Sequence, residues 1–339
     1  MTETMQLTTI DRTAVAQETG PFERGAPPVA AVEVHGLEKV YAGDVRAVKG
    51  IDFEVAPGEV FGLLGPNGAG KSTTIGMLTT TIAPTSGSAR LGGFDVVREP
   101  LAARAVSAVV FQEAVVDRGL TGRRNLEIHA RLWGLDLVAA SRRIRTVVEG
   151  FGLAELVDRP VSTYSGGQRR RLEIARALVS QPLVLFLDEP TVGLDPRIRY
   201  ELLDVIAGLR AGGEMTIVLT THYLDEAERL CDRVAIIHEG RIVALDSPAA
   251  LLATLGREIV EWRVTGDVDA ALDALVKHDI AGDDAFVVGA TVTVPLHRLS
   301  VPDAVAAIHG LGFATDAISS RAPTLDDVYL RLTGARLAA

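Results

Sequence analysis

The sequence is short of cysteine and of long apolar runs. Its single cysteine, Cys231, excludes an internal disulfide and a cysteine-rich metal site, and we expect a small buried side chain there. Every apolar run is broken by charge, glycine or proline within about ten residues, whereas a membrane-spanning helix needs roughly 18. Residues 1–20 also lack the basic start and apolar stretch of a signal peptide. We therefore expect no membrane span and a cytoplasmic location.

Basic residues are also in deficit. The 34 Lys and Arg residues are outnumbered by 44 Asp and Glu, which gives a formal net charge of -10. Because proteins that grip nucleic acid need a dominant basic surface, we expect no nucleic-acid partner. We interpret the basic run Arg169–Arg171 as a solvated helix face.

Apolar residues are plentiful, at 47% of the 339 residues, and the length favours about two domains. Residues 1–28 are polar, aperiodic and end in a Gly/Pro-rich stretch, which predicts a flexible tail. Residues 29–255 alternate apolar strands with helical segments, as in an α/β domain with a buried parallel sheet. A mostly helical stretch, about 113–177, interrupts this pattern. The predicted strands are residues 60–64, 106–111, 183–187, 216–221 and 234–237.

Residues 256–339 predict a small accessory α+β domain. It follows a predicted helix that starts at Asp246–Pro248 and ends at Gly256. Its expected order, β-α-β-β-α-β, is that of a ferredoxin-like fold, and a last helix is expected over 324–332. We expect this domain to serve packing or dimerisation. Its predicted buried faces are Val260, Trp262 and Val264; Val268, Leu272, Leu275 and Val276; and Leu325, Val328, Tyr329 and Leu332.

Residues 65–72, GPNGAGKS, match the phosphate-binding loop at every fixed position, directly after a predicted strand and before a helical segment. Glycines there let backbone N–H groups turn toward a polyphosphate at a helix N-terminus. Lys71 reaches the β and γ phosphates, which also makes it a candidate catalytic residue, and Ser72 offers a hydroxyl to Mg²⁺. The residues predicted to bind nucleotide here are Gly65, Pro66, Asn67, Gly68, Ala69, Gly70, Lys71, Ser72 and Thr73.

Two carboxylates, Asp188 and Glu189, follow the apolar run at 183–187. Ligands of open α/β sheets bind at the carboxyl ends of strands, where this pair is expected. We predict that Asp188 holds Mg²⁺ and that Glu189 is the general base that polarises the attacking water.

The segment YSGGQ at 164–168, followed by RRRLEIARAL, resembles the signature motif of ATP-binding cassette (ABC) ATPases, and the other family motifs follow in the family's order. The resemblance covers about residues 29–255. It implies a P-loop cassette with a RecA-like sheet core and an α-helical subdomain. It further implies an adenine-stacking Tyr41, a Q-loop Gln112 that senses Mg²⁺ and water, a D-loop Asp195 and a switch histidine, His222, at the γ-phosphate.

The resemblance also implies that two cassettes face each other head to tail, so that the signature of one closes over the ATP of the other. The residues given this role are Ser165, Gly166, Gly167 and Gln168. All motifs are intact, which favours a homodimer, although a heterodimer stays open. Tyr164 departs from the family's usual leucine, and we expect this difference to tune the dimer face.

A cassette of this kind drives a separate membrane permease from the cytoplasmic face. We expect the docking groove within 113–135, with Leu126, Leu132 and Trp133 as apolar candidates. Residues 322–330 and 110–134 resemble the cassettes of daunorubicin-resistance-type multidrug exporters, which implies export of hydrophobic drugs or antibiotics.

Two alternatives to the exporter make different demands on the sequence. A soluble ABC ATPase of DNA repair, ribosomes or iron–sulfur assembly would move no solute, but tandem cassettes and long coiled-coil or zinc insertions are missing here. A nucleotide-binding regulator without turnover would lack the base, yet Glu189 is in place.

Overall fold

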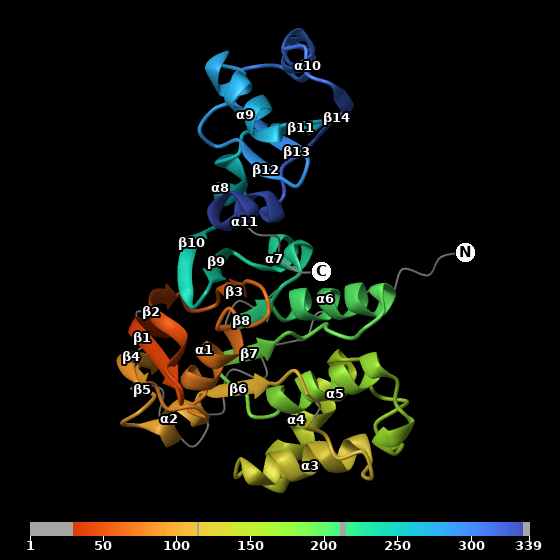
Figure 1. Cartoon of the computed structure of the whole chain (residues 1–339). Coiled ribbons are helices and arrows are strands. Elements are labelled where there is room, and N and C mark those ends of the chain that lie inside the picture. The colour runs from red at the N-terminus through yellow and green to blue at the C-terminus, as the bar shows by residue number, and fades with distance from the viewer. Residues whose placement is uncertain (1–29, 114, 211–214, 335–339) are drawn as a thin grey trace, which may run out of the picture. The chain divides into compact units, whose positions relative to one another are not determined.

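The computed structural model describes residues 30–113, 115–210 and 215–334 (Figure 1). The predicted tail at 1–28 lies outside these residues. The chain divides into two compact units. Unit 1 takes the described residues of 1–63, 70–221 and 239–241, and unit 2 takes those of 64–69, 222–238 and 242–339.

Unit 1 is built on the parallel sheet that the sequence predicts. Strand β7 (Val184–Asp188) pairs in parallel with β6 (Ser107–Val110) on one side and with β8 (Thr216–Thr221) on the other. Strand β3 (Val60–Leu64) lies next to β8. Every residue of β3, β7 and β8 is buried, because both faces of such a sheet are covered. Four predicted strands are thereby confirmed to within one residue.

A second, antiparallel sheet in unit 1 was not predicted. Its strand order is β2-β1-β4-β5, and the neighbours pair antiparallel. The ring of Phe53 in β2 stacks on Phe61 of β3, with centroids 5.2 Å apart, so apolar packing joins this sheet to the parallel one. The strands are β1 (Val32–Tyr41), β2 (Val45–Val55), β4 (Ser86–Leu91) and β5 (Phe94–Asp95).

The helices of unit 1 include the predicted helical insertion. Helices α3, α4 and α5 contact one another and lie in the chain between β6 and β7. Thr121 caps α3 and Asp136 caps α4, each through a side-chain oxygen that accepts backbone N–H bonds. The helices are α1 (Lys71–Leu78), α2 (Pro100–Ala105), α3 (Gly122–Leu132), α4 (Leu137–Gly150), α5 (Gly166–Leu178) and α6 (Pro196–Arg210), with a 3₁₀ turn at Val161–Thr163.

Unit 2 contains the predicted C-terminal fold. Its sheet has the order β12-β13-β11-β14 with antiparallel pairing throughout, and the chain order β-α-β-β-α-β is the one expected. The elements of this fold are β11 (Glu258–Val264), α9 (Val268–Lys277), β12 (Phe286–Val288), β13 (Thr291–Leu296), α10 (Val301–Gly310) and β14 (Thr315–Arg321).

Further elements of unit 2 flank this fold in the chain. The predicted helix start is confirmed, because Ser247 caps α8 by accepting the Ala250 N–H at 3.2 Å, although the helix ends before Gly256. Cys231 is buried, as expected. These elements are α7 (Leu224–Leu230), β9 (Arg233–His238), most of β10 (Arg241–Asp246), α8 (Pro248–Ala253) and α11 (Leu325–Thr333).

The predicted buried faces of the C-terminal domain hold in part. Val260, Trp262 and Val264 are all buried. Val276 and Leu332 were expected inside but are 42% and 44% exposed. In α11 the buried face is wider than one stripe because the helix contacts both α7 and α8. Among the described residues, no helix has both the length and the apolar content needed to span a membrane.

Candidate active site

The phosphate-binding loop runs between β3 and α1, as predicted. Gly70 is the N-cap of α1 and has a φ of +108°, a conformation that only glycine adopts without strain. A Cβ at Gly65 would lie 2.3 Å from the carbonyl oxygen of Ile237. The loop is therefore restricted to glycine at both positions, and the N-terminus of α1 offers the N–H groups that an anionic polyphosphate binds.

Lys71 and Glu189 meet inside unit 1. The Lys71 Nζ lies 3.2 Å from the Glu189 Oε1, and the two side chains are 4% and 7% exposed. Lys71, predicted to bind phosphate, and Glu189, the predicted base, are therefore buried next to each other. A buried charge pair is costly to maintain for stability alone, which favours a functional reason for it.

Glu189 also has an unusual backbone. Its φ is +44°, in the left-handed region that a residue with a side chain rarely adopts. Its N–H donates to Thr220 Oγ1 at 2.9 Å, which helps to hold the residue in this conformation. Strained backbone of this kind clusters at functional sites, where the surrounding structure enforces it.

Two of the three predicted Mg²⁺ ligands lie side by side. Asp188 Oδ1 accepts hydrogen bonds from Ser72 Oγ at 3.1 Å and from Thr220 Oγ1 at 2.6 Å. A hydroxyl and a carboxylate are the hard oxygen ligands that Mg²⁺ prefers, alongside nucleotide phosphates and water. The donor set therefore fits MgATP. Gln112, the third predicted ligand, has an exposed side chain two residues beyond the end of β6.

The predicted adenine-stacking residue lies near the start of α1. The Tyr41 hydroxyl is 3.4 Å from Thr73 Oγ1, so two residues predicted to bind nucleotide are neighbours. The Lys39 Nζ lies 5.2 Å from the centroid of the Tyr41 ring. The ring is 40% exposed, and an exposed aromatic ring can stack on a base.

The signature motif forms the N-terminus of α5. Ser165 and Gln168 make a capping box, in which the Ser165 Oγ accepts the Gln168 N–H at 3.2 Å and the Gln168 Oε1 accepts the Ser165 N–H at 2.8 Å. A Cβ at Gly167 would lie 2.2 Å from a methyl group of Ile198, whereas Gly166 is exposed. Asp195 Oδ1 in turn accepts the Ile198 N–H at 3.1 Å. The signature and D-loop motifs are therefore packed together.

Arg170 is a residue that the sequence reasoning missed. It is 7% exposed, so the interpretation of Arg169–Arg171 as a solvated face is wrong. Its guanidinium donates to the backbone oxygens of Phe111, Asp188 and Pro190. It therefore joins α5 to the chain just before Gln112 and to the carboxyl end of β7.

The neighbouring arginines are also engaged. Arg169 donates to the Tyr164 carbonyl oxygen at 2.7 Å, and Arg171 pairs with Glu201 at 2.8 Å. The available signal in the sequence was the spacing of Arg170 and Glu173, three residues apart on one helix face. We expected these three arginines to be exposed because the sequence pattern does not show which backbone carbonyl groups lie next to α5.

Two expectations about the helical insertion are corrected. Tyr164 was expected to tune a dimer face, but it is 4% exposed and donates its hydroxyl hydrogen to the Leu156 carbonyl oxygen. Leu126 was expected in an exposed docking groove, but its side chain is fully buried. Leu132 fits that expectation, since it is 80% exposed, and Trp133 is half-buried.

His222 belongs to unit 2. It directly precedes Tyr223, the N-cap of α7, and the two rings lie 4.2 Å apart between centroids. Its predicted contact with the γ-phosphate stays a prediction.

Comparisons with known proteins decide the family. Residues 48–192 match the family model described as ABC transporter. The chain is 42% identical over 313 residues to the daunorubicin/doxorubicin resistance ATP-binding protein DrrA of Streptomyces peucetius, covering 91% of this chain and 93% of the relative. The chain belongs to the ABC transporter ATP-binding proteins. It is also 41% identical over 316 residues to the Nod factor export ATP-binding protein I of Paraburkholderia xenovorans, covering 91% and 98% of the two chains.

Solved structures of other ABC transporter ATP-binding proteins agree with the fold. One is cbiO1 from Clostridium perfringens, part of the transporter complex cbiONQ, with a TM-score of 0.62 at 28% identity over 67% of this chain and 92% of that one. A second ATP-binding subunit of an ABC transporter gives a TM-score of 0.60 at 29% identity, covering 67% and 93%. The predicted cassette fold is confirmed, and the chain is an ATPase coupled to transport.

Proposed function

We propose that this chain is the MgATP-hydrolysing subunit of an exporter, acting as a head-to-tail pair of cassettes on a separate membrane permease. The observation that carries the proposal is the grouping of Lys71, Ser72, Asp188 and Glu189 at the carboxyl end of β7. Each of these groups has a distinct task in phosphoryl transfer.

The proposed chemistry follows from that grouping. Ser72 and Asp188 would hold Mg²⁺, which neutralises charge on the phosphates. Lys71 binds the β and γ phosphates and fixes their orientation. Glu189 accepts a proton from water as the water oxygen bonds to the γ-phosphorus and the bond to the β-phosphate oxygen breaks, which yields ADP and phosphate.

Pairing of two cassettes is proposed because the signature motif forms a second anion-binding surface, apart from the phosphate-binding loop. Ser165 and Gly166 are exposed at the N-terminus of α5. Such a helix terminus binds a phosphate group through its N–H groups and dipole. Closure over the ATP held by a second copy would use this surface, and opening would follow hydrolysis. The division into a cassette at 29–255 and an accessory domain at 256–339 is part of the same proposal.

The proposed permease-binding surface lies on the helical insertion. Ile128 and Leu132 of α3 and Leu137 and Val138 of α4 are 37%, 80%, 75% and 70% exposed. Exposed apolar side chains this close together in the chain favour a protein contact. Docking of the permease here, on the cytoplasmic face of the membrane, would transmit the opening and closing of the cassettes to its helices.

The proposed cargo is a hydrophobic drug or antibiotic. Two relatives are named for resistance to such drugs, the ATP-binding proteins DrrA of Streptomyces peucetius and of Mycobacterium tuberculosis. The second is 39% identical over 323 residues, covering 89% of this chain and 93% of the relative. The Nod factor export protein is nearly as similar, so the cassette alone leaves the cargo to the permease.

The test is to tag this chain, express it in its own host, solubilise the membranes gently and identify co-purifying proteins by mass spectrometry. We expect a polytopic membrane protein in near-equal amount. Recovery of ribosomal, DNA-bound or cluster-assembly proteins alone would instead support the soluble ABC ATPase and contradict the exporter.

A further inference from the structure

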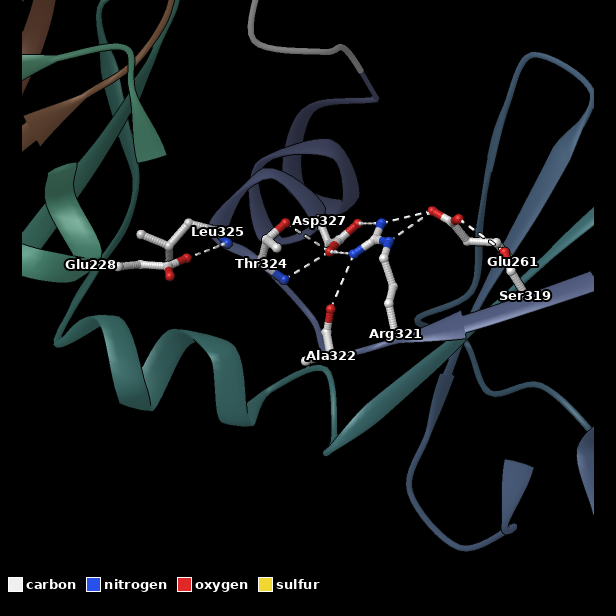
Figure 2. Close-up of polar contacts among 8 residues, drawn as sticks. All are labelled: Glu228, Glu261, Ser319, Arg321, Ala322, Thr324, Leu325 and Asp327. Atoms are coloured by element: carbon white, nitrogen blue, oxygen red, sulfur yellow. Dashed lines mark hydrogen bonds and ion pairs between the residues drawn. The ribbon is translucent and has the colours of Figure 1, made fainter. Parts of the chain in front are cut away.

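One of the first backbone N–H groups of helix α11 is bonded by a side chain from a different helix of unit 2. The backbone N–H of Leu325, its first residue, donates to the Glu228 Oε1 of α7 at 3.1 Å (Figure 2). The first N–H groups of a helix have no partner within the helix, and a carboxylate there also favours the helix dipole. Helices α7 and α11 are therefore joined by a charge-assisted hydrogen bond.

The same helix is fastened to the C-terminal sheet by Arg321, the last residue of β14. Its guanidinium donates to both oxygens of Asp327, at 2.7 and 2.8 Å, and to the Glu261 Oε1 of β11, at 2.7 and 3.0 Å (Figure 2). We call Glu261, Arg321 and Asp327 the Arg321 clamp. A planar guanidinium that binds two carboxylates fixes both in direction as well as in distance.

Asp327 lies at the centre of this arrangement. It is 1% exposed and also accepts the Thr324 N–H at 2.8 Å, which completes the cap of α11. Burial raises the pKa of the Asp327 carboxyl, but hydrogen bonds from Arg321 and Thr324 outweigh it, so the pKa lies below its usual range. The carboxylate therefore stays ionised, and the clamp stays charged at neutral pH.

Apolar packing also holds α11 in place. Leu325 and Tyr329 are fully buried, and Val328 is 3% exposed. The Tyr329 hydroxyl lies 2.7 Å from the Nδ1 of His238, the last residue of β9. The helix is thus an integral part of the core of unit 2, with contacts to α7 and α8.

Helix α7 is short and begins at Leu224, two residues after His222. The His222 ring packs against Tyr223, the N-cap of this helix. A displacement of α7 therefore displaces His222 as well. We infer that Glu228, Arg321 and Asp327 are positioning residues for ATP hydrolysis. Glu228 holds α7 against α11, and Arg321 with Asp327 holds α11 against the C-terminal sheet, so that together they fix the placement of His222. This inference rests on the proposed ATP hydrolysis and on the predicted contact of His222 with the γ-phosphate.

The first test uses Glu228, which is exposed and whose loss does not empty the core. In the full chain, Glu228→Ala should lower the kcat of ATP hydrolysis roughly 5-fold, with the dissociation constant for ATP changed by less than about twofold. Glu228→Gln retains a side-chain oxygen acceptor and should restore most of the rate. The matched control is Glu258→Ala, an exposed glutamate of β11, which should leave the rate unchanged.

A double-mutant cycle separates positioning from general destabilisation. If Glu228 acts through His222, then Glu228→Ala should leave the residual turnover of a His222→Ala chain unaltered. Independent, multiplicative losses in the double variant would overturn the inference. Arg321→Lys provides a second cycle, since lysine keeps the charge and loses the two-carboxylate geometry; it too should lower kcat in the wild-type background and leave it unchanged in His222→Ala.

The outcomes distinguish this inference from the proposed function. If the wild type hydrolyses ATP and Glu228→Ala does so at the same rate, only the positioning role is overturned. If ATP hydrolysis by the wild type were instead unaffected by Glu189→Gln, the proposed active site itself would be overturned.

Discussion

The Nη1 of Arg170 lies 3.1 Å from the Oε2 of Glu173, and both side chains are buried. Burial lowers the pKa of the Arg170 guanidinium, while Glu173 acts in the opposite direction. Glu173 in turn accepts the Val115 N–H at 2.8 Å. This pair therefore joins α5 to the segments that carry Gln112, Asp188 and Glu189.

Replacing Arg170 by Met should destabilise the fold. The change leaves the Glu173 carboxylate buried without its cation, which typically costs about 3–5 kcal/mol. Denaturant unfolding of the purified chain measures this cost. Arg171→Met is the control, because its ion pair with Glu201 is partly exposed and such pairs contribute at most about 1 kcal/mol. Equal losses in the two variants would contradict the account.

His129 should make stability depend on pH. Burial, with a smaller contribution from the positive charge of Arg176, lowers the pKa of His129 from 6.5 to about 4. Its Nε2 is buried and has no hydrogen-bond partner among the described residues. Between these two pH values the unfolded chain binds a proton that the folded chain does not. The free energy of unfolding therefore decreases as the pH falls from 6.5 toward 4.

The loss assigned to His129 is about 3 kcal/mol between pH 7 and pH 4. His129→Phe keeps a ring next to Trp133 and removes the titration, so the advantage of the wild type over this variant should shrink by that amount. Urea unfolding at a series of pH values measures it. His309→Phe, at an exposed position in α10, should show no such trend. A pH-independent difference for His129→Phe would contradict the burial argument.

Leu132→Asp should separate ATP binding from attachment to the permease. Leu132 is 80% exposed on α3, so a carboxylate there disturbs little of the fold but disrupts an apolar contact. We expect unchanged nucleotide affinity and at least about 10-fold less co-purifying permease, which corresponds to roughly 1.4 kcal/mol. Trp133→Ala, at the neighbouring half-buried position, should weaken attachment in the same direction.

Leu101→Asp is the control for the permease contact. Leu101 is 77% exposed on α2, outside the proposed surface, so its replacement should leave attachment unchanged. Equal attachment of the Leu132→Asp chain and the wild type would exclude Leu132 from the proposed surface.

The phosphate-binding loop and the Asp188–Glu189 pair could be predicted from the sequence because each has a local physical cause. The roles of Tyr41, Gln112, Asp195 and His222 came instead from the resemblance to ABC ATPases. The parallel strands were visible as apolar runs, and residues 184–188 are buried without exception. The antiparallel sheet of unit 1 was not predicted, since β1 mixes exposed and buried residues and its register with β2 shifts three times. Such irregular pairing leaves no steady two-residue period to detect.

Side chains whose contact partners are distant in the sequence were not identified from the sequence alone. Arg170 was assigned to solvent because its partners, the carbonyl groups of Phe111 and Pro190, lie far from it in the chain. Leu330 is buried and Leu332 is exposed in α11, a helix that contacts both α7 and α8. Both errors come from tertiary contacts that helical periodicity does not encode.

Glu189→Gln tests the central claim most directly. The amide keeps the size of the side chain but cannot accept the proton of the attacking water, so kcat for ATP hydrolysis should fall at least about 100-fold. ATP should then hold two chains together, visible as a dimer by light scattering, while Glu155→Gln at an exposed site should behave as the wild type. Turnover of Glu189→Gln at the wild-type rate would contradict the assignment of the base.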